Sequence, residues 1–435
     1  MVWLFCFILA GPAMAAIITV TTTEDLPGNP GNCSLREALN AVIDPGVLPI
    51  DACEPGDPDS ANNPDTIVFS LPLPATITLS AALPTIDSVD DGVTISGSGP
   101  DSHQVTISGA NQFRVFRIGG GETVTIEGLT IANGRIDDGG GVLNQGILTI
   151  KNATIAGNFG TDDGGGIDNS GTLRVENSTF TGNSANEEGG GVVNFQNATF
   201  VNTTFSGNRA GLNATSPTGR DGGGAIFNSG GTVTLINCTI AGNTNVGGTQ
   251  LGDGIFTEDA NSVPRIAVTT LQSTLVAAND NDNCMRTGQN PIADGGGNLD
   301  DGVTCDFTDP TSLPNVPAGL AAGLQNNGGP TFTIALTAAS AAIDSVVNCA
   351  AAESLANRDQ RGAPRPTDGD GDGNAICDIG AFEADAFQSS NQPPVVTNPG
   401  NQTGVVGANV NLTISASDPD GNTFNYSATG LPAGL

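Results

Sequence analysis

One short pattern, repeated four times between residues 137 and 243, constrains the fold of this chain more than any other feature. The copies are DDGGGVLNQGILTIKNATIAGN (137–158), DDGGGIDNSGTLRVENSTFTGN (162–183), EEGGGVVNFQNATFVNTTFSGN (187–208) and DGGGAIFNSGGTVTLINCTIAGN (221–243). Gly139, Gly164 and Gly189 lie 25 residues apart, and Gly222 follows after 33 more. A fixed period in the twenties is typical of a solenoid, in which each repeat buries its apolar face against its neighbours.

Within each copy, aliphatic residues alternate with polar ones, as at Leu148 and Ile150 and again at Leu173 and Val175. This period of two predicts strands rather than helices. A unit of this length holds about three strands of roughly five residues with tight turns. The sequence therefore predicts an all-β chain in which each copy forms one coil of a parallel β-helix, with coils stacked about 4.8 Å apart.

Asparagine recurs at two fixed places in every copy. Because asparagine tolerates left-handed turns and can bond to its equivalent in the next coil, we expect two ladders along the helix. The predicted ladders are Asn144, Asn169, Asn194 and Asn228, and Asn158, Asn183, Asn208 and Asn243.

Acidic residues precede the glycine triplets: Asp137–Asp138, Asp162–Asp163, Glu187–Glu188 and Asp221. If the coils stack in register, one edge carries acidic groups every 5 Å or so, inside a Debye length of about 8 Å. Such a column is either splayed into water or bridged by Ca²⁺, and the sequence leaves both open. The extra residues 209–220 of the longest step are expected to project from this edge.

The motifs resemble those of a known family. Residues 223–226 read GGAI, and residues 180–183 and 205–208 read FTGN and FSGN. They are similar to the GGAI and FxxN motifs of the polymorphic outer-membrane proteins and related bacterial β-helix surface proteins. The resemblance implies a right-handed parallel β-helix at the cell surface.

The net charge of the chain limits which classes of molecule can bind to it. The formal net charge of the 435 residues is −32, and aromatic residues make up only 4% of the chain. Such a surface repels nucleic acid and anionic membranes and attracts divalent cations. Nucleic acid is therefore excluded as a partner, and the core is expected to be small and β-branched.

The N-terminus predicts export. Residues 1–16 form an apolar run that ends in Ala13-Met14-Ala15, which is typical of a signal-peptide cleavage site. A transmembrane anchor is the alternative for this run, and no later segment approaches the roughly 20 apolar residues that a spanning helix needs. We expect a secreted protein or one at the bacterial cell surface.

Seven cysteines follow the leader, and export predicts that they are oxidised. Proximity in sequence suggests the pairs Cys33–Cys53, Cys284–Cys305 and Cys349–Cys377, although sequence cannot prove the connectivity. Cys238 then remains as a buried, unpaired thiol.

Residues 17–64 are interpreted as an N-terminal cap. Ser34 and Glu37 have the spacing of a capping box, so a short helix should begin at Leu35 and cover the end of the solenoid. The stretch CSLREA (33–38) resembles the motif of that name near the start of secreted bacterial β-helix proteins.

The β-helix is predicted over residues 65–283, with further strands of less strict repeat between 65 and 133. His103 lies in a polar turn and is expected to be exposed rather than catalytic. Residues 284–387 resemble the bacterial choice-of-anchor module, which precedes one of several sorting signals. The matching stretches are NNGGPT (326–331), AID (342–344), DQRGAPRP (359–366) and CDIGAFE (377–383).

A candidate calcium site lies inside that module. Asp368, Asp370, Asp372 and Asp378 are acidic residues in or just after a glycine-rich stretch, and such carboxylates can converge on a hard cation. The spacing is not that of an EF-hand, since Ile379 occupies the twelfth position. A solvated acidic turn is the alternative.

Residues 388–394 read as a linker, and residues 395–435 resemble the start of an Ig-like or cadherin-like domain. In that resemblance Asp418 and Asp420 are candidate calcium ligands. About 40 residues are present where such a sandwich needs roughly 100, so we expect a truncated domain.

The functional expectation is an adhesive or structural protein that presents a regular face to an extracellular glycan or a cell-surface protein. The main alternative is a lyase or hydrolase of an acidic polysaccharide, which needs clustered carboxylates or calcium with a basic residue. Identical repetition of the acidic pairs argues against the enzyme, because an active site is a single break in a pattern. A fragment without a function of its own is the third possibility.

Overall fold

The structure, a computed structural model, describes residues 15–26, 28, 30–44, 52–56, 64–87, 89, 92–97, 99, 104–213, 222–247, 252–259, 266–287, 292–346, 349, 357–385, 395–397 and 414–417. The chain divides into two compact units, Met1–Asp385 and Ala386–Leu435. The predicted signal peptide falls almost wholly outside the described residues, as do His103, Asp418 and Asp420.

The first unit is built from four parallel sheets, whose described strands are as follows. Sheet A has the order β1 (Ile17–Val20), β2 (Asp65–Phe69), β4 (Val93–Ser96), β7 (Thr123–Glu127), β11 (Ile147–Lys151), β15 (Thr172–Glu176), β19 (Asn197–Val201), β23 (Thr232–Ile236), β27 (Val268–Gln272) and β30 (Ala293–Asp294). Sheet B has the order β3 (Ala75–Thr78), β5 (Val105–Ser108), β8 (Thr130–Ala132), β12 (Thr154–Ala156), β16 (Thr179–Thr181), β20 (Thr204–Ser206), β24 (Thr239–Ala241), β28 (Leu275–Ala277), β31 (Leu299–Asp300) and β32 (Leu313–Pro314).

The other two sheets are narrower. Sheet C has the order β6 (Phe116–Ile118), β10 (Val142–Asn144), β14 (Ile167–Asn169), β18 (Val192–Asn194), β22 (Ile226–Ser229), β26 (Ile255–Glu258) and β29 (Cys284–Thr287). Sheet D has the order β9 (Arg135–Ile136), β13 (Phe159–Gly160), β17 (Ser184–Ala185), β21 (Arg209–Ala210) and β25 (Thr244–Asn245).

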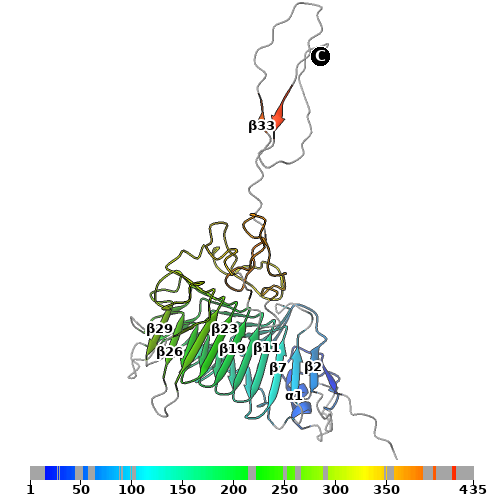
Figure 1. The fold of residues 1–435 in the computed structure, drawn as a ribbon. Helices are drawn as coiled ribbons and strands as arrows, with labels where there is room; N and C mark the ends of the chain where they lie inside the picture. Colours follow the sequence, from blue (N-terminus) through cyan, green and yellow to red (C-terminus); the bar gives the residue numbers. More distant parts are fainter. Residues whose placement is uncertain are drawn as a thin grey trace, which may run out of the picture. The chain divides into compact units, whose positions relative to one another are not determined.

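One coil passes through the sheets in turn, as β10, β11, β12 and β13 do, and then begins again in the next coil (Figure 1). Equivalent residues face each other across the coils: Leu148 pairs with Leu173, and Leu173 pairs with Ala198. All the paired strands of this unit run parallel, which confirms the predicted all-β parallel β-helix. The less regular segment before residue 133 also forms coils of this kind.

The interior is filled by the residues that alternate with polar ones in the sequence. Leu148 and Ile150 are fully buried, whereas Ile147 on the opposite face is 48% exposed. The rings of Phe180 and Phe205 stack with centroids 4.6 Å apart in successive coils. At the turn before sheet C, Gly139 has φ of +60°, and a Cβ there would lie 2.4 Å from the carbonyl oxygen of Val142. The glycine is therefore required by both conformation and space.

Both predicted asparagine ladders are present and fully buried. In the first, the side-chain amide of Asn144 donates to Asn169 at 2.7 Å, and Asn169 donates to Asn194 at 2.7 Å. In the second, Asn158 donates to Asn183 and Asn183 to Asn208, each at 2.9 Å. Each side-chain amide thus hydrogen-bonds to its neighbour in the next coil, so these buried polar groups have hydrogen-bond partners.

The helix α1 (Leu35–Ile43) covers the N-terminal end. Its capping box is formed as predicted: the backbone N–H of Ser34 donates to the Glu37 carboxylate at 2.9 Å, and the backbone N–H of Glu37 donates to Ser34 Oγ at 3.3 Å. Leu35 and Leu39 are fully buried against the first coil. Of the residues that the structure describes, no helix is long and apolar enough to cross a membrane.

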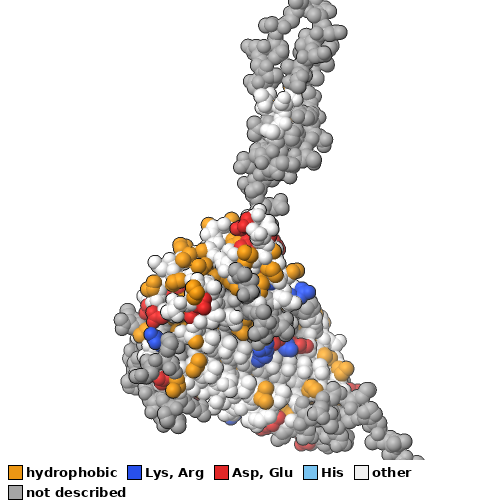
Figure 2. All heavy atoms as spheres, viewed as in Figure 1, with side chains coloured by type: hydrophobic (Ala, Val, Ile, Leu, Met, Phe, Trp, Pro, Cys, Tyr) orange, Lys and Arg blue, Asp and Glu red, His pale blue; other side chains and the backbone are white. Residues whose placement is uncertain are grey.

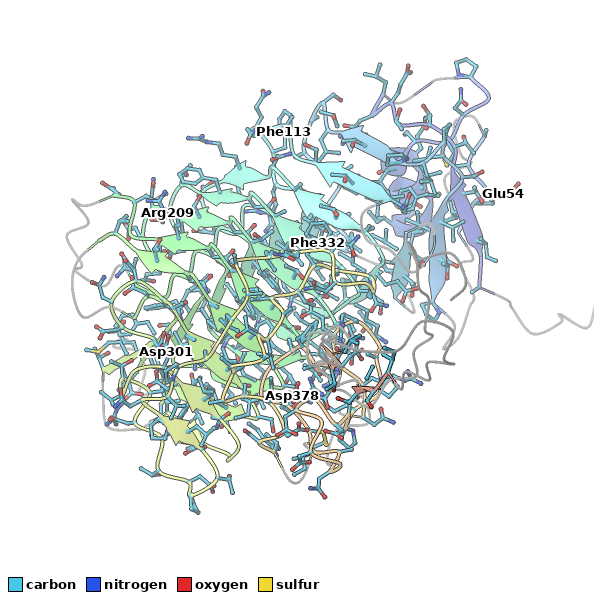
Figure 3. All side chains as sticks on the ribbon, turned by 90° about the horizontal axis from the view of Figure 1, so that it is seen from above. Glu54, Phe113, Arg209, Asp301, Phe332 and Asp378 are labelled. Carbon is cyan, nitrogen blue, oxygen red and sulfur yellow. A yellow bond between two sulfur atoms is a disulfide. The ribbon has the colours of Figure 1, made fainter. Side chains whose placement is uncertain are left out.

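Strands β29 to β32 extend sheets A, B and C beyond residue 283, so the last coils lie inside the segment that resembles the choice-of-anchor module. The chain then returns over the outer face of sheet B (Figures 1 and 3). The amide of Gln360 donates to Thr179 Oγ1 at 2.9 Å and accepts from Thr204 Oγ1 at 2.6 Å. The backbone N–H of Ala381 donates to Thr239 Oγ1 at 2.9 Å. A column of threonines in sheet B thus holds the C-terminal part of this unit.

The three disulfides suggested by the sequence are formed: Cys33–Cys53, Cys284–Cys305 and Cys349–Cys377. Cys238 is a free, buried cysteine, as expected. Burial raises the pKa of its thiol to about 12, so it stays protonated. The second unit contributes an antiparallel pair, β33 (Val395–Val396) and β34 (Ala416–Ser417).

We predict that Asn183→Ala lowers the free energy of unfolding by about 3 kcal/mol, because it removes the acceptor of both the buried Asn158 backbone N–H and one N–H of its side-chain amide. Asn197→Ala is the matched control, since Asn197 is exposed, and it should change stability by less than about 0.5 kcal/mol. Urea unfolding of the two variants beside the parent chain measures both. Equal losses in the two variants would show that the ladder does not stabilise the fold.

Candidate functional site

Of the six predicted calcium ligands, the structure brings two together. One carboxylate oxygen each of Asp368, Asp370 and Asp344 lies within 4.8 Å of the others. Asp344 also accepts the backbone N–H groups of Gly369 and Asp370, at 3.0 and 2.8 Å. Asp344 was not among the predicted ligands, because it precedes the glycine-rich stretch by more than 20 residues.

Asp372 and Asp378 lie outside this group. The carboxylate of Asp372 accepts from the backbone N–H of Asn374 at 2.7 Å. Asp378 is fully buried and accepts the backbone N–H groups of Asp344 and Ala384, at 2.8 and 2.5 Å. Burial and the nearby Glu383 raise the pKa of Asp378 to about 7. These contacts place Asp378, labelled in Figure 3, in the packing of the last part of the first unit. It is not one of the three converging carboxylates.

The acidic turns between sheets D and C stack in register, as the repeat predicts. The backbone N–H of Asp162 donates to the carbonyl of Asp137 at 2.9 Å, and that of Glu187 donates to the carbonyl of Asp162 at 3.0 Å. One carboxylate oxygen each of Asp138, Asp162 and Asp163 lies within 4.8 Å of the other two. The first two turns therefore form a compact cluster of negative charge, which we call the acidic turn site.

The electrostatics of this site reflect burial and like charge. Burial, with the charges of Asp162 and Asp138, raises the pKa of Asp163 to about 7, although the backbone N–H of Glu188 bonds to its carboxylate at 3.0 Å. Burial and the Asp162 charge also raise the pKa of Asp138. The neighbouring negative charges thus make ionisation of Asp138 and Asp163 less favourable.

The guanidinium of Arg114 lies beside the acidic turn site and bonds to its backbone. It donates to the carbonyl oxygen of Asp138 at 2.6 Å and to that of Gly139 at 3.1 Å. Burial and the nearby Arg117 lower the pKa of Arg114, against the raising effect of the acidic groups. Arg114 therefore fixes the first turn through its bonds to the backbone carbonyls.

Asp168 is a further acidic residue beside the acidic turn site. The sequence interpretation missed it. It lies on the outer face of sheet C, in a column whose other members are Arg117, Leu143, Val193, Phe227, Phe256 and Met285. It is only 7% exposed, and one of its carboxylate oxygens has no hydrogen-bond partner. Burial and the Asp138 charge raise its pKa to about 7.

A signal for Asp168 is present in the repeat. The two residues before the first ladder asparagine read VL, ID and VV in the first three copies and IF in the fourth, so one copy alone has a charge at that position. Asp168 is thus a single break in an otherwise repeated pattern. A single break of this kind is what an active site in a repeat protein would show.

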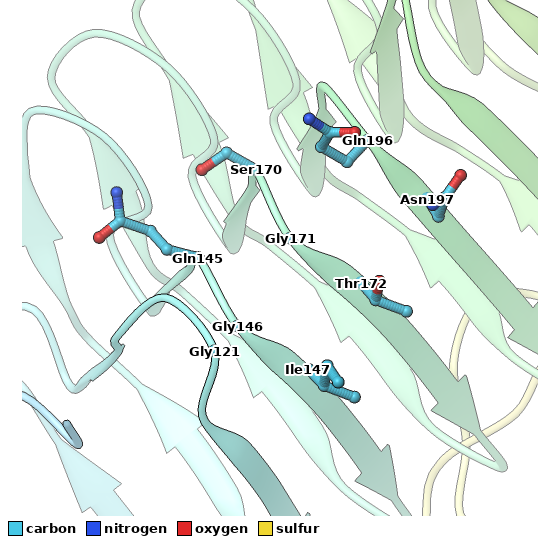
Figure 4. Close-up of a pocket in the computed structure, with 9 residues that line it drawn as sticks. All are labelled: Gly121, Gln145, Gly146, Ile147, Ser170, Gly171, Thr172, Gln196 and Asn197. Carbon is cyan, nitrogen blue, oxygen red and sulfur yellow. The ribbon is translucent and has the colours of Figure 1, made fainter. Parts of the chain in front are cut away.

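A shallow groove runs along the Gly-rich turns between sheets C and A (Figure 4). Its first part has a volume of about 210 Å³, and the side chains of Gln145, Ser170 and Gln196 stand along it on successive coils. A second part of about 270 Å³ continues it past Gln196 and Asn197 to Ile266. The groove therefore crosses several coils and offers amide and hydroxyl groups at each.

The outer face of sheet A adjoins this groove and is largely uncharged (Figure 2). One outward column consists of threonine at seven of eight successive positions: Thr66, Thr94, Thr125, Thr149, Arg174, Thr199, Thr234 and Thr270. All eight are partly exposed. Charges on this face include the pair formed by Arg174 and Glu176, 2.5 Å apart.

Comparisons with known proteins bear on the fold. A model of the putative Ig domain family matches residues 393–435, which confirms the Ig-like prediction for the C-terminal segment. No curated protein sequence matches the chain. Among solved structures, the chain is similar to the crystal structure of pectate lyase Pel9A, with 13% identity and a TM-score of 0.42, over 86% of this chain and 98% of that one. Neither match assigns a role to the acidic turn site or the groove.

The raised carboxyl pKa values predict how stability depends on pH. The unfolded chain has aspartate pKa values near about 3.9, so the folded chain binds more protons between about pH 4 and pH 7. Asp168 therefore contributes to a stability that falls as pH rises through this range and levels off above about pH 7.

We predict that Asp168→Asn flattens this dependence and raises the melting temperature at pH 8 more than at pH 5. Thermal melts in a chelator measure the effect, and the exposed Asp385→Asn is the control. An unchanged pH slope in Asp168→Asn would mean that Asp168 is not protonated on folding.

Proposed function

We propose that this chain is an exported, non-catalytic β-helix of the extracellular space or bacterial cell surface that adheres to an uncharged, extended glycan. The proposal is supported by one observation above all: the outward column of sheet A has threonine at seven of eight positions, in a chain of net charge −32. Export is supported by the predicted signal peptide and by three disulfides, which persist in oxidising compartments. The resemblance to CSLREA and choice-of-anchor proteins stays a prediction.

The chemistry of the face suits a neutral polymer. Each threonine offers a hydroxyl that both donates and accepts hydrogen bonds, with a methyl group beside it. Successive rungs repeat about every 4.8 Å, so the surface is regular in one direction. The groove beside it adds the amides of Gln145 and Gln196. Many weak, repeated contacts on one long face favour an extended ligand over a small molecule.

We predict that the full chain sediments with an insoluble neutral polysaccharide from a panel of cellulose, chitin and xylan. Thr125→Glu with Thr234→Glu should weaken this binding at least about tenfold, because it places negative charges between neighbouring threonines of the ladder. Thr76→Glu, an exposed threonine of sheet B, is the matched control and should bind as the parent does. If both variants bind normally, the face of sheet A is not the contact surface.

The enzyme alternative has one observation in its favour, the acidic turn site with Asp168 and Arg114. A carboxyl group with a pKa near 7 is suited to general acid or base chemistry. Against it, the bonds of Arg114 go to backbone carbonyls, and the unpartnered oxygen of Asp168 is buried. Release of unsaturated or reducing ends from pectin or alginate, abolished by Asp168→Asn, would establish the enzyme and overturn the adhesive function.

Calcium binding by the loop at residues 368–374 also stays a proposal, now with Asp344 in place of Asp378. Three converging carboxylates supply the hard oxygen ligands that Ca²⁺ prefers. We predict that calcium raises the melting temperature of the parent more than that of Asp344→Asn. An equal rise in both would remove this loop as a site.

A further inference from the structure

The acidic turn site combines features that together indicate a bound ion. Asp138, Asp162 and Asp163 converge from two successive coils, and none of the ion pairs found in the described part of the chain involves them. Three carboxylates at this spacing repel one another strongly in a partly buried setting. A shared cation would relieve this repulsion.

Asp168 supplies a second, independent observation. It belongs to strand β14 rather than to the turns, and its side chain faces the turn that carries Asp138, since a Cβ on Gly139 would lie 3.2 Å from Asp168 Cβ. It is 7% exposed and has a carboxylate oxygen without a hydrogen-bond partner. The nearby Arg114 compensates part of its charge, and a buried acidic group with its bonding unsatisfied favours further positive charge nearby.

We propose that Asp138, Asp162 and Asp163 bind one Ca²⁺ ion between two coils, with Asp168 beneath the turn adding to the negative field that holds the ion. The donor set is carboxylate oxygen throughout, which favours a hard cation over zinc or copper. Water would complete the six to eight ligands that Ca²⁺ takes. This site is independent of the glycan-binding function proposed above.

The structure also explains why the site is single rather than repeated along the whole edge. In the next coil the turn carries Glu187 and Glu188, and Val193 replaces Asp168 in the column on sheet C. The backbone N–H of Glu188 bonds to Asp163 and closes the site on that side. Among the described turns, the carboxylates therefore converge with a buried acid beneath them at the first two only.

Because the ligands come from two coils, the ion would tie successive coils together at the turn. Saturable binding would distinguish the site from a solvated cluster.

The test is calorimetric titration of Ca²⁺ into the full chain after chelator treatment, at pH 8 and low salt. We expect saturable binding with a dissociation constant below about 1 mM. The double variant Asp138→Asn with Asp163→Asn should weaken this Ca²⁺ binding at least about tenfold. Asp168→Asn should weaken it less.

Glu187→Gln is the control for the adjacent turn, and Asp344→Asn is the control for the loop at residues 368–374. Both variants should leave Ca²⁺ binding at the acidic turn site intact. Circular dichroism of every variant in chelator verifies folding, and the isosteric Asp168→Asn provides a second route if the double variant does not fold. No binding by the parent chain, or equal loss in Glu187→Gln, would overturn the proposal.

Discussion

The rest of the structure depends on the hydrogen bonds between the backbones of successive coils. Strand by strand, each residue of one coil faces its equivalent in the next, as Leu148 faces Leu173. This register turns every position of the repeat into a column along the molecule. A shift of one residue would reverse the sides of the sheet, placing apolar groups outside and polar groups inside. The buried ladders through Asn169 and Asn183 oppose such a shift, because each amide bonds to its equivalent in the next coil.

The columns differ in chemistry, and this difference separates the surfaces of the protein. On sheet A, the outward column is threonine except at Arg174 and is partly exposed to solvent. On sheet B, threonines again line the surface, but Gln360 and the segment around it cover Thr179 and Thr204. On sheet C, the outward column is largely apolar and is interrupted by Asp168. The turns beside it collect the acidic groups. A repeat with one set of spacings thus provides an exposed threonine face, a face covered by the later part of the same unit, and an acidic edge.

The sequence predicts what repeats and misses what occurs once. The asparagine ladders, the capping box of Ser34 and Glu37, and the stacking of Asp137 on Asp162 all follow from fixed spacings or local rules. Asp168 escaped notice because it is one deviation within one copy. Asp344 joins Asp368 through a turn of the chain that no local pattern encodes. The contact of Gln360 with Thr179 spans 181 residues and depends on tertiary packing alone.

The most direct test of the account is a distance measured across the coils of sheet A. Spin labels at Thr94→Cys and Thr234→Cys, on outward positions five coils apart, should be separated by about 24 Å plus the label tethers, from the spacing of parallel strands. Double electron–electron resonance on the full chain should give one narrow distribution near that value. A broad distribution, or one displaced by a coil spacing or more, would contradict the register on which every surface described above depends.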